Sequence, residues 1–401
     1  MAKLLILHPY RETYTDIYSC LSKNHHYTLL IDDSKVESFE TNKPTNVTLV
    51  TTQHYPEKRK ETSQGILQRS HFDAIVALDE FDMVLAAELR EQFHIKGQSV
   101  SQAKTFRDKD KMTQKVSELG FKIPHSWKIS SYAELKNFFK QHGDIILKPL
   151  DGAGSVDTFH LKSDNDLSPF DSDNFWGDKT VLVQEYIYSD VYHIDGFVSH
   201  GNIIYCEPSQ YIFNPLLIKE GISAAGVSLD HTSKHFKKLV DYASELSKKL
   251  YPDGTFLFHL EVFYDGHEII FLEIASRIGG ARIRQNLQYK LTYNPLELLL
   301  TAICNDTLPI LPTVFPVTGW LLTAKKEGVI QQLPELTETI KEQYSIFDYI
   351  TYTQIGKQLH SAFHSADAVV GFSCHGSTFR ETKNNLLGAE TWVLENTRYK
   401  K

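Results

Sequence analysis

Two glutamates, Glu261 and Glu273, lie in apolar segments that can place two carboxylates side by side. The segments are His259-Leu-Glu-Val-Phe263 and Ile270-Phe-Leu-Glu-Ile274, and Asp265-Gly266 between them is a turn signal. They are therefore predicted to pair as an antiparallel hairpin. Carboxylates on one face of a hairpin repel each other, and a divalent cation such as Mg²⁺ would relieve that repulsion. The pattern predicts a Mg²⁺ site, and the alternative is two unrelated glutamates that face solvent.

Arg277 lies just past the second carboxylate, in Ala275-Ser-Arg-Ile-Gly-Gly280. A guanidinium at this place can bind a substrate carboxylate and stabilise a phosphoryl or acyl-phosphate group during transfer. The glycines after it permit close approach of the backbone to a ligand. The alternative for Arg277 is a structural ion pair.

Lys148 ends an apolar segment and is followed by the glycine-rich stretch Asp151-Gly-Ala-Gly-Ser155. Backbone N–H groups of such a stretch can hold phosphates, and a lysine before it favours that interpretation. The stretch is neither a Walker A loop, because no Gly-Lys-Ser/Thr follows, nor a Rossmann fingerprint. A plain hairpin connection is the alternative.

Two further signals are weak when taken alone. Gln184-Glu-Tyr-Ile187 ends an apolar strand, where backbone groups can meet the edge of an adenine ring. Lys109 lies in the charged run Arg107–Met112, for which a solvated helix surface is the default interpretation.

The elements that must position these residues alternate between strands and helices in the N-terminal part. Such alternation is typical of a parallel α/β sheet. The predicted strands are Lys3–Leu7, Tyr27–Ile31, Phe72–Leu78, Asp144–Lys148 and Val181–Ile187, with hairpins at Tyr192–Ser199/Asn202–Cys206 and Thr255–Tyr264/His267–Ile274. The predicted helices are Thr15–Lys23, Met83–Phe93, Ser99–Gly120 and Ser233–Leu250; residues 163–179 are predicted as a surface loop, and strands and short helices resume from about 310.

Composition narrows the class of protein without naming a function. With 401 residues, 41% hydrophobic and 23% charged, the chain is predicted to be a soluble enzyme of two or three domains. A net charge of −8 gives no reason to expect a nucleic-acid partner. No apolar run of roughly 18–20 residues predicts a membrane span. The four scattered cysteines form no CxxC pair, so we expect reduced thiols and a cytoplasmic location.

In this order and spacing the motifs resemble those of the ATP-grasp superfamily, specifically its carboxylate–amine ligases, over residues 70–285. Arg107-Asp-Lys109 is similar to the helix that carries the first ATP lysine, and Lys148 to Ser155 resembles the second lysine and the glycine loop. Gln184–Ile187 is similar to the hinge that binds adenine through its backbone. Glu261, Glu273 and Arg277 match the two metal-binding carboxylates and the catalytic arginine.

The resemblance implies an ATP-grasp fold of the α/β class with α+β elements. Residues 1–106 would form a parallel α/β domain, 107–187 a linker helix and lid, and 188–401 an antiparallel-sheet catalytic domain with a terminal extension. ATP and Mg²⁺ are the implied cofactors, with Mn²⁺ as an alternative metal. Implied site residues are Arg277 for catalysis, Glu261 and Glu273 for the metal, and Lys109, Lys148, Gly152, Gly154, Ser155, Gln184, Glu185 and Ile187 for ATP.

Two positions depart from the family pattern. Val191 stands where a ribose-binding glutamate is frequent, so Asp190 is a candidate substitute. Ala275 stands where an asparagine often completes the metal site, so water would take that place.

The implied reaction is the ADP-forming activation of a small-molecule carboxylate, by default an amino acid, followed by attack of an amine. Two alternatives stay open: transfer to a thiol, as on a carrier protein, and a nucleotide-binding regulator without catalysis. The oligomeric state also stays open, with a homodimer among the options. Candidates for an acceptor pocket, for each of which an ordinary surface or packing residue is the default interpretation, are Glu80, His193, Arg282, Arg284, His360, His364 and His375.

Overall fold

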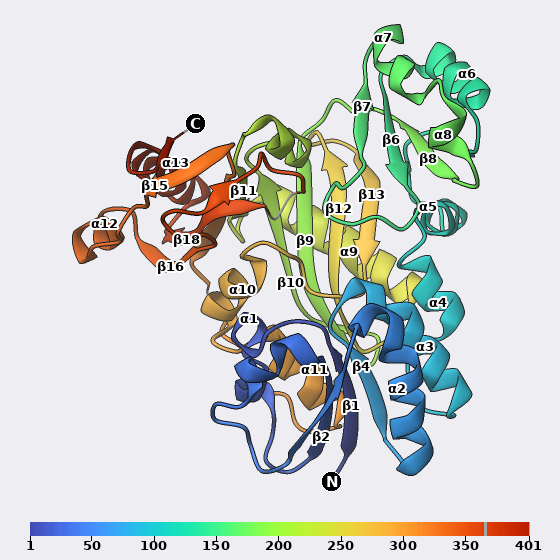
Figure 1. Cartoon of the computed structure of the whole chain (residues 1–401), viewed down its shortest axis with the longest axis vertical. Helices are drawn as coiled ribbons and strands as arrows, with labels where there is room; N and C mark the ends of the chain where they lie inside the picture. The colour runs from blue at the N-terminus through green and yellow to red at the C-terminus, as the bar shows by residue number, and fades with distance from the viewer. Residues whose placement is uncertain (314, 365–366, 401) are drawn as a thin grey trace.

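The computed structural model describes residues 1–313, 315–364 and 367–400 of the chain. Figure 1 shows an N-terminal α/β region in blue at one end, a small green region at the other, and a large sheet between them. This mixed architecture confirms the predicted fold class. Among the described residues, no helix is long and apolar enough to cross a membrane.

The N-terminal region is a parallel sheet of order β3-β2-β1-β4. The two central strands, β1 and β2, are buried on both faces, which explains why their sequences are mostly apolar. The elements are β1 Lys3–His8, β2 His26–Asp32, β3 Val47–Thr52, β4 Ala74–Ala77, α2 Tyr55–Arg69 and α3 Met83–Gln92. Strands β1, β2 and β4 and helix α3 confirm the predictions for this region, whereas β3 and α2 were not predicted.

The helix predicted over Thr15–Lys23 is wrong. A short α1 (Glu12–Thr15) ends at Asp16, whose backbone is left-handed with φ 52°, and a 3-10 turn follows at Ile17–Cys20. Ser19 Oγ donates to both the carbonyl and the carboxylate of Asp16. Such local hydrogen bonds between side chain and backbone compete with helix formation.

The single helix predicted over Ser99–Gly120 is two helices, α4 (Val100–Thr105) and α5 (Lys109–Glu118). Asp108 interrupts them because its backbone is extended and its carboxylate accepts the N–H groups of Asp110 and Lys111. The break starts a new helix at Lys109, which therefore lies at an N-terminus rather than along a solvated helix face.

The small region, which we term the lid, is an antiparallel sheet of order β5-β8-β6-β7 with its own core. Residues 163–179 were predicted as a loop but contain two short helices. There Ser163 and Asp166 form a capping box, and Phe170 and Trp176 are buried in the lid core. The lid elements are β5 Ser126–Ile129, α6 Tyr132–His142, β6 Ile145–Pro149, β7 Phe159–Leu161, α7 Asp164–Leu167, α8 Asp173–Trp176 and β8 Val181–Glu185.

The large sheet has eight antiparallel strands in the order β13-β12-β9-β10-β11-β14-β18-β16. It contains both predicted hairpins, β9–β10 and β12–β13. Its strands are β9 Val191–Ser199, β10 Asn202–Tyr211, β11 Ala224–Ser228, β12 Phe256–Tyr264, β13 Ile269–Ala275, β14 Val317–Ala324, β16 Ile346–Thr351 and β18 Ala368–Gly376.

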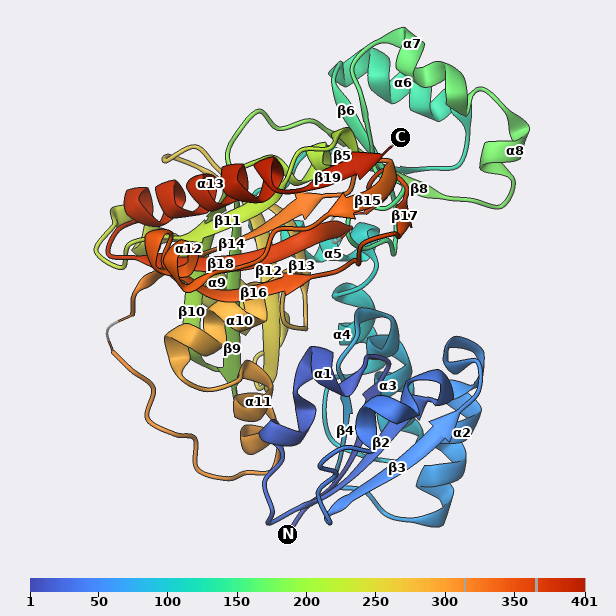
Figure 2. The ribbon, with the colours of Figure 1, turned by 60° about the vertical axis from the view of Figure 1, so that its left-hand side comes forward.

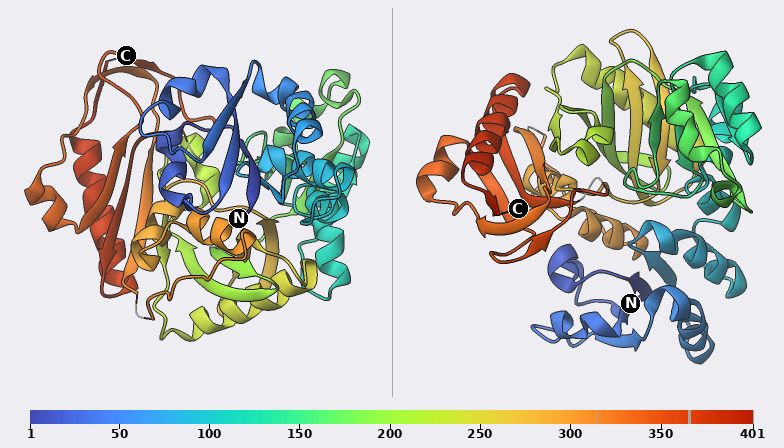
Figure 3. Two further views of the ribbon diagram at one scale, coloured as in Figure 1. Left: turned by 90° about the horizontal axis from the view of Figure 1, so that it is seen from below. Right: turned by 45° about the horizontal axis from the view of Figure 1, so that its top comes forward.

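Helices cover both faces of this sheet. On one face α9 (Lys234–Leu250) packs against β9 and β10, and α13 (Phe379–Glu395) packs against β14 and β18. On the other face α10 (Ile283–Leu291) and α11 (Pro295–Ile303) lie between the sheet and the N-terminal region, as Figure 2 shows. Helix α13, on the side of the C-terminal strands away from the N-terminal region (Figure 3), is longer than the short helices predicted after residue 310. The domain boundaries proposed at 106 and 187 stay a prediction.

Candidate functional site

A cavity of about 310 Å³ lies between the lid and the large sheet. Its walls come from the glycine-rich stretch, the end of β8, and the faces of β12 and β13. The structure brings all eleven predicted site residues together around it, while their individual roles stay predictions. These are Lys109, Lys148, Gly152, Gly154, Ser155, Gln184, Glu185, Ile187, Glu261, Glu273 and Arg277.

Glu261 and Glu273 are direct cross-strand partners in the β12–β13 hairpin. Strand alternation directs Glu261 to the cavity, while its neighbours Leu260 and Val262 are buried in the core that includes α9. The Oε1 atom of Glu261 accepts a 2.6 Å hydrogen bond from the hydroxyl of Tyr211. Among the described residues, neither Oε2 atom of the pair has a partner. Two carboxylate oxygens are thus available to a hard cation, and the donor set fits Mg²⁺.

The charge of Glu261 is stabilised locally. Burial raises its pKa, but hydrogen bonds from His259 and Tyr211 and the charge of His259 lower the pKa to about 2. The His259 Nε2 atom lies 3.5 Å from Glu261 Oε1.

Two lysines line the same cavity as the carboxylates. Lys109 Nζ lies 3.1 Å from Glu273 Oε1 and donates to the carbonyl of Gly152. Lys148, on β6, is only 6% exposed, and within the described part of the chain no carboxylate lies within 4.0 Å of its Nζ. Burial lowers the pKa of Lys148 to about 8, although the charge of Glu273 opposes the shift. Lys148 is therefore a buried cation without a counter-ion, beside a cavity.

The glycine-rich stretch connects β6 to β7 along the edge of the cavity. Gly154 and Ser155 adopt the left-handed conformation, with φ of 63° and 60°, which glycine adopts without strain. Arg107 donates to the carbonyl of Asp151 at 2.6 Å, and Lys109 donates to that of Gly152. The side chains of Arg107, between α4 and α5, and of Lys109, at the start of α5, thus hold this stretch beside the cavity.

The end of β8 lines the cavity. Gln184 is buried and donates to Ser126 Oγ at 3.0 Å, and the Glu185 carboxylate accepts the N–H of His125. Among the described residues, the backbone N–H of Ile187 has no partner. Apolar side chains around it belong to Ile146, Val191, Phe263 and Leu272. Asp190, the predicted substitute for a ribose ligand, accepts instead from Gln210 and is not among the lining residues.

Arg277 forms an ion pair with Glu80 of the N-terminal region. Its Nη2 and Nε atoms lie 2.6 and 3.0 Å from Glu80 Oε2, and the other oxygen of Glu80 accepts from Arg107 at 2.8 Å. Burial raises the pKa of Glu80, but the charges of Arg277 and Arg107 outweigh it and lower the pKa. Sequence reasoning considered Glu80 for an acceptor pocket, whereas the structure places it as the partner of the predicted catalytic arginine.

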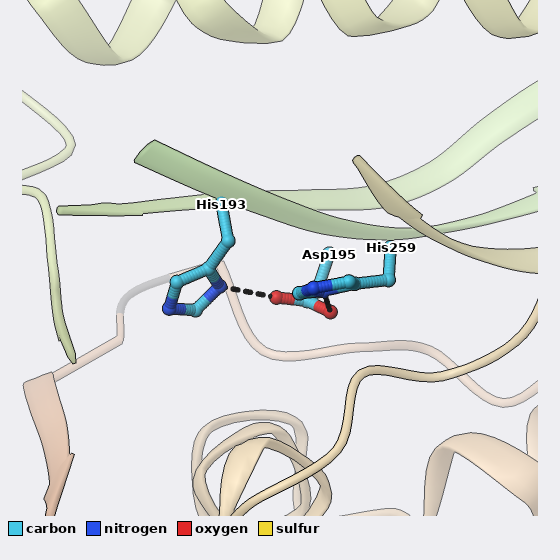
Figure 4. A group of neighbouring side chains, drawn as sticks. All are labelled: His193, Asp195 and His259. Carbon is cyan, nitrogen blue, oxygen red and sulfur yellow. Dashed lines mark hydrogen bonds and ion pairs between the residues drawn. The ribbon is translucent and has the colours of Figure 1, made fainter. Parts of the chain in front are cut away.

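A buried hydrogen-bonded group, His193, Asp195 and His259, lies beside the carboxylate pair (Figure 4). Both Nδ1 atoms contact Asp195, at 2.6 Å for His193 and 2.9 Å for His259. The ligand atoms lie within 4.8 Å of one another, as in a metal site. However, the indole N–H of Trp320, which can only donate, lies 3.3 Å from His193 Nε2. His193 therefore carries its proton on Nδ1, where it donates to Asp195 and cannot ligate a metal.

Sequence reasoning missed most of this group. It considered His193, but not Asp195, His259, Tyr211 or Trp320. A signal was available, because His193 and Asp195 on β9, like His259 and Glu261 on β12, are two residues apart and so share a face.

The other acceptor-pocket candidates are not among the cavity-lining residues. Arg282 pairs with Asp348, Arg284 donates to the carbonyl of Tyr14, and His375 stacks on Tyr289. His364 lies 3.4 Å from Asp367, and His360 is exposed.

Comparisons with known proteins bear on the fold. Residues 106–281 match the model of the ATP-grasp domain. L-amino acid ligase from Bacillus licheniformis is similar in structure, with a TM-score of 0.78 and 14% identity over 100% of this chain and 99% of that one. A comparison with curated protein sequences found no significant match.

Two further solved structures are also similar. Phosphoribosylglycinamide synthetase from Anaerococcus prevotii has a TM-score of 0.69 and 12% identity, covering 100% of this chain and 99% of that one. Carboxyaminoimidazole ribonucleotide synthase from Aspergillus clavatus, complexed with ATP, has a TM-score of 0.72 and 15% identity, covering 98% and 99%. Residues 106–281 are therefore an ATP-grasp domain, and the fold of the whole chain is similar to that of these ligases and synthetases.

Proposed function

We propose that the protein is an ATP- and Mg²⁺-dependent, ADP-forming ligase that activates a carboxylate as an acyl phosphate and joins it to an amine. Lys148 is the observation that carries this proposal. A buried cation is costly without a counter-ion, and Lys148 lines the same cavity as Lys109 and two carboxylates suited to a metal. The polyphosphate of a metal-bound nucleotide has the charge and shape to complete this arrangement.

The order of side chains along β12 supports one orientation of ATP. Phe263, Glu261 and His259 face the cavity in succession, with about 7 Å between alternate residues of a strand. Adenine would lie near Phe263 and the N–H of Ile187, and the phosphates near the lysines. The carboxylate to be activated would then lie beyond Glu261, toward His259 and Arg277.

In the first step a carboxylate oxygen attacks the γ-phosphorus, the bond to the β-phosphate oxygen breaks, and ADP leaves. Lys109 and Lys148 would neutralise the phosphates, and Glu261 and Glu273 would hold the metal. Bound Mg²⁺ would supply charge neutralisation at the transferring group. An amine then attacks the acyl carbon, inorganic phosphate leaves, and the nitrogen loses a proton. Arg277 would stabilise the oxyanion and the departing phosphate, while the glycine-rich stretch excludes water.

The cavity favours an amino acid or another small acid over a phosphorylated substrate. Among its described lining residues, the lysines and arginines are Lys109, Lys148 and Arg277. All three have a place in ATP binding or in the transfer, so none is left for a substrate phosphate. The nearby Arg282 is already paired with Asp348.

The test is an ADP-release screen over pairs of amino acids and small carboxylic acids, with thiol acceptors included. We expect acid-dependent ADP formation, a hydroxamate when hydroxylamine is added, and an amide product by mass spectrometry. A Glu273→Ala variant should lose the activity. Nucleotide binding without ADP formation for any pair, or full activity of Glu273→Ala, would contradict the proposal. A thioester product would show that the acceptor is a thiol and not an amine.

A further inference from the structure

The end of the cavity beyond Glu261 is built from aromatic and small side chains. We call it the floor and define it by Tyr211, Ala224, His259, Ala281, Ile283 and Trp320, all of which line the cavity. Apart from the imidazole of His259, none of these side chains can carry a positive charge. The floor thus differs in chemistry from the part of the cavity that contains the lysines.

Trp320 lies outside the matched ATP-grasp domain, on β14, yet it reaches this floor. It is 4% exposed and makes an edge-on contact with Tyr211, at 6.0 Å between ring centroids and 87° between planes. Gly226 lies opposite Trp320 across one strand pair and opposite Tyr211 across the other. The missing side chain of Gly226 lets the two rings approach each other.

The position of the indole is fixed by two constraints. Its N–H lies 3.3 Å from His193 Nε2, and His193 is held by Asp195. A Cβ atom on Gly226 would lie 2.8 Å from both His193 Nε2 and Trp320 Nε1, so even alanine there would displace the pair. Trp320 is therefore a rigid wall.

Behind this wall lies a second, much smaller cavity of about 10 Å³. Trp320 and Ile283 line both cavities, so they separate one from the other. The buried ion pair between Lys290 and Glu207 also lines the small cavity. Removal of the indole would join the two spaces and lengthen the floor.

We propose that Trp320 determines specificity for the acid substrate, and that the floor takes a compact, uncharged, apolar side chain. The inference rests on the proposed ligase function, because it assigns the acid to the floor. An acid bound with its carboxylate near Arg277 would pack its apolar part against the indole and Tyr211. On this wall a second carboxylate or a phosphate of the substrate would meet no basic side chain except His259, whose two ring nitrogens already contact Asp195 and Glu261, and such burial is unfavourable.

The test compares wild type with Trp320→Ala and Trp320→Phe over a graded series of acids, from small to bulky and from apolar to acidic. Truncation should raise the ratio of kcat/KM for bulky over small apolar acids by about tenfold or more, the order expected when one pocket wall changes. The dissociation constant for ATP should stay unchanged. Trp127→Ala is the matched control, because Trp127 is 65% exposed on the lid strand β5.

Two outcomes would overturn the inference: unchanged size selectivity in both Trp320 variants, or a wild-type preference for acidic or phosphorylated acids. Should Trp320→Ala fail to fold, Trp320→Phe keeps an aromatic ring and supplies the selectivity measurement. Failure of the ligase proposal is distinguishable, because wild type would then bind ATP and release no ADP with any acid.

Discussion

The two ends of the cavity are built in opposite ways. The end where we propose that the nucleotide binds brings opposite charges close together, from Lys109, Lys148, Glu261 and Glu273. At the floor, His259 is the one basic side chain, and its partners are Asp195 and Glu261; the other floor residues are aromatic or apolar. Phosphoryl transfer makes the same electrostatic demand whatever acid is activated, whereas the choice of acid depends on shape. Variants at the charged end should therefore change the rate of the reaction with every acid. Variants at the floor should change which acid is used.

The largest effect is expected for Glu273→Gln, which should lower kcat for ADP formation about 10³-fold with every acid, as loss of a charged transition-state group does. Steady-state ADP release with each acid measures it. Glu268→Gln is the control, because Glu268 is exposed near the turn of the same hairpin and pairs with Lys122. An effect of Glu273→Gln confined to some acids would remove the distinction between the two ends.

Lys148→Met should weaken ATP binding by about 100-fold, which corresponds to about 2.7 kcal/mol. The unfolding temperature without nucleotide should stay the same or rise, because the variant removes a buried charge that has no partner. Calorimetry of ATP binding and thermal unfolding measure the two quantities. Lys128→Met on β5 is the control, since Lys128 is half exposed and pairs with Asp110. Unchanged ATP affinity would show that Lys148 does not meet the nucleotide.

Asp195→Asn should raise KM for the acid about tenfold while the affinity for ATP stays constant. His193 and His259 contact different oxygens of Asp195, and the amide has only one oxygen. One histidine therefore loses its hydrogen bond, and His193 and His259 are no longer held by the same residue. Initial rates at varied acid and varied ATP separate the two constants. Asp241→Asn, on the exposed face of α9, is the control. An equal rise in both constants would instead indicate general loss of structure.

The smallest effect is a pH dependence of ATP binding. Because burial lowers the pKa of Lys148 to about 8, the free protein loses this charge as the pH rises through 8, and ATP binding must then restore the proton. The dissociation constant for ATP should rise several-fold between pH 7.5 and 8.5. Because the pKa of Lys148 is lowered, the charged lysine destabilises the folded state. This destabilisation decreases as the pH rises above 8. Lys148→Met should abolish this dependence of ATP affinity.

The sequence predicted the nucleotide end far better than the floor. Lys148 and its glycine-rich stretch are contiguous, and the Glu261–Glu273 pair follows from one hairpin with a strong turn signal. The floor joins side chains from β10, β11, β12, β14 and α10, and no local pattern specifies which distant strands become neighbours. The break between α4 and α5 was missed for a related reason, because Asp108 resembles one more residue of a charged helix until its role as a cap is seen.

The bond between Glu80 and Arg277 has a consequence for how this protein can be divided or recombined. Glu80 belongs to the N-terminal region, and it binds one arginine from the linker and one from the end of β13. An N-terminal half transplanted from a relative without an acidic residue at this position would leave two guanidinium groups, one buried and one half-buried, without the carboxylate between them. Chimaeras and circular permutants of this chain should therefore inherit all three residues together, as a single unit of exchange.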